Sequence, residues 1–279
     1  MRRIAIMTLS GKSELYPEIN EIVKDYVIRS DITLMKNKNY SDMFSITMYQ
    51  DFDAYSKLMD LIKKNDIRYT FSEGREYTKK EINDSAFLDI GIVYPWEHDL
   101  YNAEYYGTQY SYENKCSACG MGKTQISELI INTKKIKKGD IISINPEMMI
   151  SKGLHDMIID NGLTGCEFGA VRDYKGRDDE TYYQLKINNI LPPMDSQTKM
   201  HVGDSRYCYE CKRNGMYLDS EIIYKSSDIE NAKDFNLSEE YIGVANYCMQ
   251  RVIVSKKFFD LYMKSKMKGI NRVEPIKIY

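Results

Sequence analysis

The sequence predicts an α+β protein with mixed or antiparallel sheets and short helices. Three observations support this class. Short strand-like runs recur along the chain, helical spacing of apolar residues is confined to brief segments, and the 43% hydrophobic and 29% charged content is typical of a globular protein. The 279 residues suffice for one large domain or two small ones. A net charge of -2 supplies no global basic field that would attract nucleic acid or anionic lipid.

Residues 1–95 are expected to form a small α+β unit. Helical spacing is found over residues 14–29. It recurs in a second segment that ends at about Lys64, and Asp51 or Asp53 would cap the start of that helix. The first apolar run is too short for a signal peptide, and no stretch approaches the length of a membrane span. We therefore expect a cytoplasmic protein whose first strands are residues 3–8, 43–49, 67–71 and 86–93.

Residues 96–279 are expected to form a second α+β domain with an internal repeat at 141–175 and 250–279. The two segments match at an offset of 104 residues (151 to 255). A serine suits a helix N-cap and a glycine suits the turn after the helix, so each copy predicts a strand, a short helix and a strand. A chance match between two such units is the alternative. Further strands are expected at 127–132, 141–145, 181–188 and 215–224. The identical pairs are Ser151/Ser255, Lys152/Lys256, Asp156/Asp260 and Gly165/Gly269.

Four of the six cysteines form two C-x-x-C pairs. A two-residue gap lets one tight turn point both sulfurs at a common centre, and two such turns supply the tetrahedral shell of a structural Zn²⁺. Gly120 follows the first pair and suits a turn that needs positive φ. Four thiolates leave no open coordination position, so a catalytic role for the metal is not expected. The predicted ligands are Cys116, Cys119, Cys208 and Cys211.

The two pairs are far apart in the sequence. Compact zinc ribbons place about 15–20 residues between their pairs, whereas residues 120–207 intervene here. Loop-closure cost grows slowly with length, so remote pairing is physically reasonable. The alternatives are two independent redox dithiols, or cysteines without a role, but neither pair has the strand-then-helix setting of a redox dithiol. Cys166 and Cys248 are expected to be small buried hydrophobic residues.

The three histidines are expected to have structural or surface roles. His155 occupies the position of Phe259 in the second repeat copy, which favours packing. His98 precedes Asp99, and His201 precedes Asp204 by three residues, but short His–Asp spacings are common by chance. The sequence contains no nucleophile elbow, paired-carboxylate motif or dinucleotide fingerprint.

From Glu81 to Asn114 the chain is acidic and aromatic and contains no lysine or arginine. Aromatic anchors surrounded by one sign of charge suit the recognition of a basic protein surface. The alternative is a loop with core tyrosines and solvated acids. The residues predicted to bind a partner are Trp96, Glu97, Asp99, Tyr101, Glu104, Tyr105 and Tyr106.

Several motifs after residue 115 follow a known pattern. They are Cys116-Ser-Ala-Cys119-Gly120, Gly-Leu-Thr-Gly from Gly162 leading to Phe168, Cys208-Tyr-Glu-Cys211, and a Val-Ser…Gly-Ile…Pro-Ile pattern over 254–276. Residues 115–279 thus resemble the double-CXXCG motif proteins, which are similar to immunity proteins found beside bacterial polymorphic toxins. Lys212 departs from the pattern, because glycine is expected there. The resemblance implies a cytoplasmic zinc-containing protein that neutralises a cognate toxin without catalysis.

Three functional hypotheses result. The first is a non-catalytic, zinc-scaffolded immunity protein whose partner is a basic toxin domain. The second is a nucleic-acid-binding zinc-ribbon protein, because basic residues flank the cysteines, although the neighbouring segment is acidic. The third is an enzyme that uses His98 or His201. We favour the first and expect no membrane partner. The flanking basic residues are Lys115, Lys123, Lys212 and Arg213.

Overall fold

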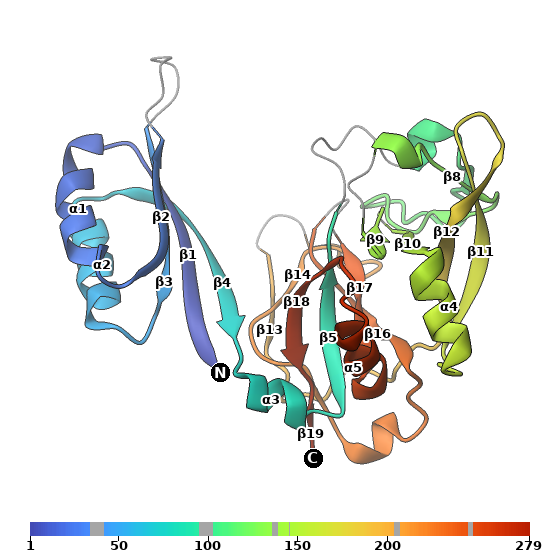
Figure 1. The fold of residues 1–279 in the computed structure, drawn as a ribbon. Coiled ribbons are helices and arrows are strands. Elements are labelled where there is room, and N and C mark those ends of the chain that lie inside the picture. The colour runs from blue at the N-terminus through green and yellow to red at the C-terminus, as the bar shows by residue number, and fades with distance from the viewer. Residues whose placement is uncertain (34–41, 95–102, 136–138, 145, 204–206, 245–247) are drawn as a thin grey trace. The chain divides into compact units, whose positions relative to one another are not determined.

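The computed structural model describes residues 1–33, 42–94, 103–135, 139–144, 146–203, 207–244 and 248–279 (Figure 1). The chain has an α+β fold and divides into two compact units, Met1–Glu81 and Ile82–Tyr279. Within the described ranges, no helix has both the length and the apolar character needed to cross a bilayer.

The first unit is a four-stranded sheet with two helices on one face (Figure 1). The strand order is β2-β3-β1-β4 and all neighbours are antiparallel, which is the β-α-β-β-α-β arrangement of ferredoxin-like folds. Alternate residues of the central strands, such as Met7 and Ile46, are buried against Ile19 and Leu58 of the helices. The elements are β1 (Arg2–Ser10), α1 (Tyr16–Val23), β2 (Val27–Thr33), β3 (Met43–Tyr49), α2 (Asp53–Lys64) and β4 (Arg68–Glu76).

Two details of this unit differ from expectation. The helix expected over 14–29 ends at Val23, and the apolar residues after it belong to the edge strand β2. Neither Asp51 nor Asp53 caps α2, because the N-cap residue is Phe52 and it makes no side-chain cap.

The second unit contains two larger sheets, with strand orders β8-β11-β12-β10-β9 and β16-β17-β5-β18. Its helices are α4 (Lys152–Asp160) and α5 (Lys256–Lys264), and α3 (Lys79–Asp84) spans the division between the units. The strand expected over 215–224 is split in two. The strands are β5 (Phe87–Ile92), β6 (Tyr110–Ser111), β7 (Thr124–Gln125), β8 (Leu129–Ile130), β9 (Ile141–Ser143), β10 (Met148–Ser151), β11 (Cys166–Arg172), β12 (Asp178–Ile187), β13 (Met200–Val202), β14 (Met216–Leu218), β15 (Ile223–Tyr224), β16 (Phe235–Ile242), β17 (Met249–Ser255), β18 (Ile270–Pro275) and β19 (Lys277–Ile278).

The predicted repeat has the same order of elements in both copies, β10-α4-β11 and β17-α5-β18. Each helix begins at the expected serine. The Ser151 hydroxyl accepts a hydrogen bond from the Leu154 N–H (3.2 Å), and the Ser255 hydroxyl accepts one from the Phe258 N–H (3.1 Å). These caps explain why two short helices start at equivalent positions after a strand.

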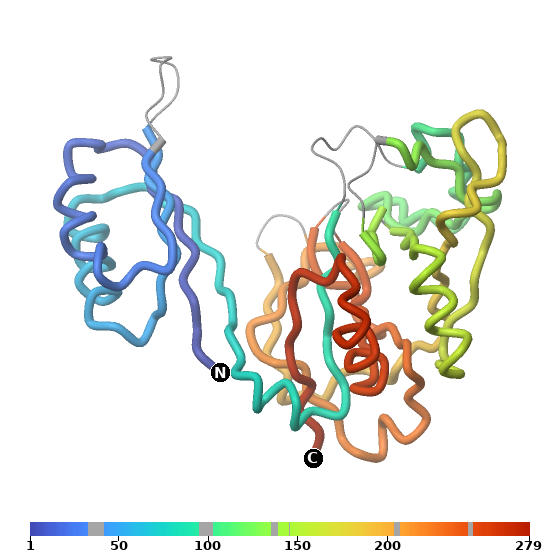
Figure 2. The backbone as a smooth tube through the Cα atoms, viewed as in Figure 1, coloured from blue at the N-terminus to red at the C-terminus, as the bar shows by residue number. Residues whose placement is uncertain are grey.

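The repeat is larger than predicted, and its second copy is circularly permuted. In the first copy, β12 lies between β10 and β11 and is antiparallel to both. In the second copy, the equivalent place between β17 and β18 is taken by β5, which comes from much earlier in the chain (Figure 2). The outer strands also correspond, because β9 pairs with β10 in the first copy and β16 pairs with β17 in the second.

Because β5 belongs to the second copy, the division between the two units lies earlier in the chain than expected. The sequence placed the boundary at residue 95 because residues 86–93 read as one more strand of the N-terminal unit. The contacts divide after Glu81 instead, since β5 is an inner strand of the second unit's sheet.

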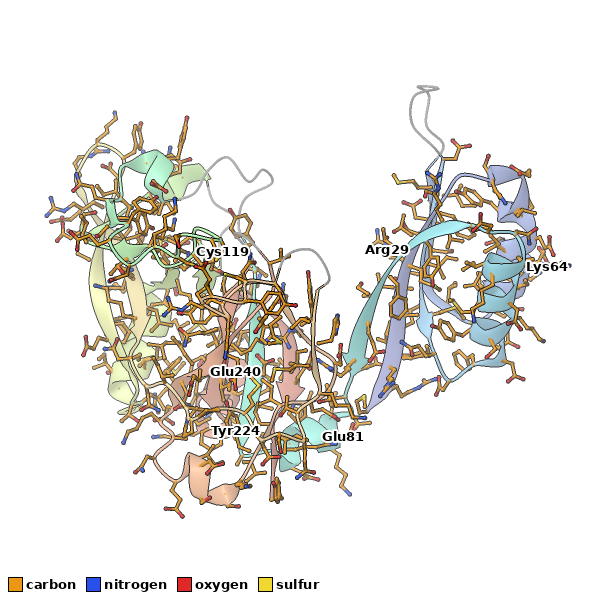
Figure 3. All side chains as sticks on the ribbon, turned by 180° about the vertical axis from the view of Figure 1, so that it is seen from behind. Arg29, Lys64, Glu81, Cys119, Tyr224 and Glu240 are labelled. Carbon is orange, nitrogen blue, oxygen red and sulfur yellow. The ribbon has the colours of Figure 1, made fainter. Side chains whose placement is uncertain are left out.

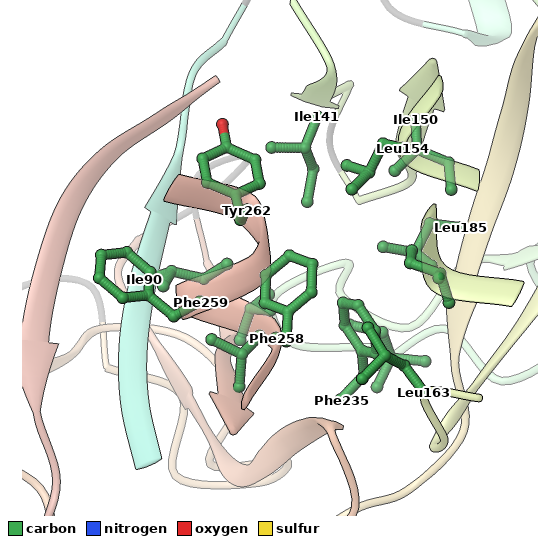
Figure 4. Close-up of a cluster of buried hydrophobic side chains, with 14 of the residues drawn as sticks. Ile90, Ile141, Ile150, Leu154, Leu163, Leu185, Phe235, Phe258, Phe259 and Tyr262 are labelled. Carbon is green, nitrogen blue, oxygen red and sulfur yellow. The ribbon is translucent and has the colours of Figure 1, made fainter. Parts of the chain in front are cut away.

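One apolar core joins the two copies (Figure 4). Leu154 of α4 and Phe258 of α5 belong to the same buried cluster as Leu185 of β12 and Ile90 of β5. Each copy therefore buries its apolar face against the other, as a sheet-and-helix layer requires.

Candidate metal centre

Each C-x-x-C pair lies in the loop of a two-stranded hairpin. The first pair lies between β6 and β7, and the second lies between β13 and β14; both strand pairs are antiparallel. Figure 3 marks the site by Cys119. Two hairpins with cysteine turns at their tips form the ribbon arrangement expected for a tetrathiolate site, although they come from distant parts of the chain.

The two cysteine turns share one backbone conformation. The Gly120 N–H donates to the Cys116 carbonyl (2.9 Å), and the Lys212 N–H donates to the Cys208 carbonyl (2.9 Å). Gly120 has a φ of 78° and Lys212 a φ of 55°. Lys212 thus takes the left-handed conformation that glycine takes in the first turn.

The turns bring the four predicted cysteine sulfurs together, all within 4.8 Å of one another. Cys116 Sγ lies 3.7 Å from Cys208 Sγ, and Cys119 Sγ lies 3.4 Å from Cys211 Sγ. These distances exceed the disulfide bond length of about 2.05 Å. They approach the ~3.8 Å edge of a tetrahedron with a metal–sulfur distance of ~2.3 Å. The cluster is therefore a candidate metal site.

Backbone donors point at these sulfurs. The N–H groups of Cys211 and Glu210 donate to Cys208 Sγ and hold the pKa of that thiol down to about 7. Burial raises the pKa of the Cys119 thiol to about 12, although the Met121 N–H donates to it. A bound cation would favour ionisation of all four thiols, since metal ligands must be thiolates.

The other two cysteines are buried or half-buried, as expected. Cys166 packs against the main core, and burial raises the pKa of its thiol to about 12. Cys248 donates to the Arg213 carbonyl just beyond the second cysteine turn, and burial raises the pKa of its thiol to about 11. This contact was not predictable from the sequence, because Cys248 has no neighbouring cysteine to mark it.

Three of the four basic side chains that flank the cysteines contact neighbouring groups. Lys123 lies 4.1 Å from the centre of the Tyr110 ring and 3.7 Å from Glu104. Arg213 lies over the Tyr241 ring at 5.4 Å, and Lys115 lies 5.6 Å from the Tyr112 ring.

Three of the seven residues predicted to bind a partner fall within the described ranges, and two of them, Glu104 and Tyr105, are exposed. Glu104 accepts from the Tyr112 hydroxyl (2.5 Å) and pairs with Lys123. Tyr106 packs against the buried cluster around Leu129. Tyr105 is 65% exposed. Trp96, Glu97, Asp99 and Tyr101 lie outside the described residues.

The histidines with described surroundings lie in packing or surface settings. His155 stacks on Tyr183 with ring centres 4.1 Å apart. His201 stacks on Tyr217, and its Nδ1 lies 2.7 Å from an Asp219 oxygen; the side chains of His201 and Asp219 are both exposed. His98 and Asp204 lie outside the described residues.

The four cysteines thus form the one His/Cys/Asp/Glu cluster with metal-ligand spacing found in the described part of the chain. Sequence reasoning identified all four, because the C-x-x-C spacing reflects a local turn. No protein-family model matches this sequence, and no curated protein matches it significantly.

Proposed function

We propose that Cys116, Cys119, Cys208 and Cys211 hold one structural Zn²⁺. The approach of four sulfurs from two hairpins carries this proposal. Thiolates are soft ligands that suit Zn²⁺, and four of them close its coordination shell. The ion would fasten the hairpins β6-β7 and β13-β14 together and contribute on the order of 10 kcal/mol to folding.

We infer that the protein is a zinc-scaffolded binding protein rather than an enzyme. A closed tetrathiolate site offers no position for substrate, and the side chains of His201 and Asp219 are both exposed. The resemblance to double-CXXCG proteins favours a cytoplasmic immunity protein that neutralises a basic toxin domain. Nucleic-acid binding is less favoured, because Lys123 is engaged by an acidic and an aromatic side chain.

The metal is tested by elemental analysis of protein purified without added metal. We expect about one zinc per chain. Cys116→Ser should abolish stoichiometric binding, whereas Cys166→Ser is the matched control and should retain it. Wild-type protein without bound metal, or full zinc content in Cys116→Ser, would overturn the site.

The binding role is tested by co-purification with the product of the adjacent gene and by protection of cells that express that product. Tyr105→Ala should weaken the complex, while Tyr174→Ala is the control, since Tyr174 is 50% exposed in the β11–β12 turn. If the gene product neither binds nor loses toxicity, the immunity role is wrong. Salt-dependent binding to DNA or RNA would favour the nucleic-acid hypothesis instead.

A further inference from the structure

The edge strand β4 of the first unit is long and regular. It pairs with β1 over nine consecutive residues, from Arg2↔Glu76 to Ser10↔Arg68, without a register shift. Because β4 is the last strand in the order β2-β3-β1-β4, half of its backbone N–H and C=O groups point away from the sheet. Such a row of groups is a template for pairing with another strand.

The two edges of this sheet differ. At the opposite edge, β2 has a register shift between Val27 and Arg29, and a bulge of this kind discourages pairing with another chain. β4 contains neither a bulge nor a proline. Arg68 to Glu73 are all exposed, including Tyr69 at 43% and Phe71 at 46%. An exposed aromatic edge with neither a bulge nor a proline is open to a partner strand, provided that the partner matches the charges of β4.

The sequence of β4 is complementary to itself in the antiparallel direction. If two copies meet with Ser72 opposite Ser72, Arg68 lies opposite Glu76 at both ends, and Tyr69 lies opposite Arg75. Opposite charges across a strand pair stabilise it, and an arginine can stack on a tyrosine ring. Moving the axis one residue toward Glu73 would place two glutamates opposite each other, and moving it toward Phe71 would lose both arginine–glutamate pairs.

We propose that two copies of this chain associate through β4, centred on Ser72, so that their first-unit sheets form one continuous antiparallel sheet. The two-fold axis makes the contact self-complementary and closed. This contact depends on neither the cysteine site nor the proposed binding role.

A charge swap tests the pairing in the full-length protein by analytical ultracentrifugation over a concentration series. The wild type should be a dimer. Arg68→Glu and Glu76→Arg should each weaken dimerisation by about tenfold or more, because each replaces two attractive pairs with two repulsive ones. The double variant should restore it. Within one chain the two residues are eight positions apart on one strand, roughly 27 Å, so restoration requires contact between chains.

Arg29→Glu on the bulged edge is the matched control and should leave the dimer unchanged. Ser72→Cys gives a second test, because a cysteine at the axis should form a disulfide between copies under mild oxidation, whereas Ser30→Cys on β2 should not. A monomeric wild type, a double charge swap that stays monomeric although circular dichroism shows it folded, or equal cross-linking of both cysteine variants would overturn the proposal.

Discussion

Asp140 and Asp234 hold equivalent places in the two repeat copies, and each carboxylate binds the turn of the opposite copy. Asp140 directly precedes β9, and Asp234 directly precedes β16. One Asp140 oxygen accepts from the Ser151 hydroxyl of its own copy (2.8 Å), and the other accepts from the Lys268 N–H (2.8 Å) before Gly269.

Asp234 makes the same two kinds of contact, with the roles of the two copies exchanged. It accepts from the Ser255 hydroxyl (2.6 Å) and from the Thr164 N–H (2.9 Å) before Gly165. Each aspartate thus links the helix cap of one copy to the glycine turn of the other. The two copies are held by two matching polar clamps as well as by their shared core.

Asp140→Ala and Asp234→Ala should therefore lower the free energy of unfolding by similar amounts. About 1.5–3 kcal/mol is expected for each, because a charged acceptor is lost and a backbone N–H is left without its partner. Urea unfolding followed by circular dichroism measures this. Asp160→Ala at the exposed end of α4 is the control. A large effect from only one aspartate would show that the clamps are not equivalent.

Gly165 and Gly269 are needed because the backbone of the opposite copy lies against them. A Cβ on Gly165 would lie 2.2 Å from the Phe235 carbonyl oxygen, and one on Gly269 would lie 2.0 Å from the Ile141 carbonyl oxygen. Both residues also have positive φ, 92° and 125°. Each change to alanine should cost more than about 3 kcal/mol, because strain and a backbone clash combine.

Gly176→Ala is the control for these two variants. Gly176 has a φ of 77° but no atom within 4 Å of its Cβ position, so only the conformational cost of about 1–2 kcal/mol remains. Thermal unfolding that ranks Gly176→Ala with the other two would show that the opposing carbonyls are not decisive.

Lys212→Gly should stabilise the protein, unlike most substitutions in a cysteine turn. Lys212 has a φ of 55° at the position that Gly120, with a φ of 78°, holds in the first turn. Glycine removes the left-handed strain, and a net gain of about 0.5–1 kcal/mol is expected after its larger unfolded-state entropy is counted. The melting temperature of zinc-loaded protein measures the gain. Lys199→Gly is the control, and a loss of stability in Lys212→Gly would show that the lysine side chain contributes more than its strain costs.

The cysteine cluster and the repeated helices were predictable because both arise from local chemistry. A C-x-x-C turn and a serine cap each require a few neighbouring residues, and Ser151, Ser255 and the four cysteines behave accordingly. The left-handed turn at Lys212 was not predictable, since no glycine marks it.

The sheet assignment of β5 depends on contacts far along the chain. Its residues read correctly as a strand, but alternation does not say which sheet a strand joins. The equivalence of Asp140 and Asp234 was not visible in the sequence for a similar reason. These residues are 94 positions apart (140 to 234), whereas the caps are 104 apart, so an alignment of the caps does not align the aspartates.

The buried carboxyl of Glu147 should make stability depend on pH. Glu147 is 8% exposed in the β9–β10 connection, and burial raises its pKa, although the nearby Tyr110 hydroxyl opposes the shift. A carboxyl whose pKa is higher in the folded state contributes stability below its unfolded pKa of about 4.3, and that contribution is lost as pH rises toward the folded value. At neutral pH the folded protein therefore bears a cost for this group.

Glu147→Gln keeps the shape of the side chain and removes the ionisation. The variant should be more stable than the wild type by about 1 kcal/mol or more at pH 7–8, and the difference should vanish near pH 4. Urea unfolding at a series of pH values checks this, with Glu180→Gln on the exposed part of β12 as the control. The quantity to compare is the difference between variants, because acid would release a thiolate-bound metal from all of them. A difference that is constant with pH would mean that hydrogen bonding, and not desolvation of the carboxylate, governs this position.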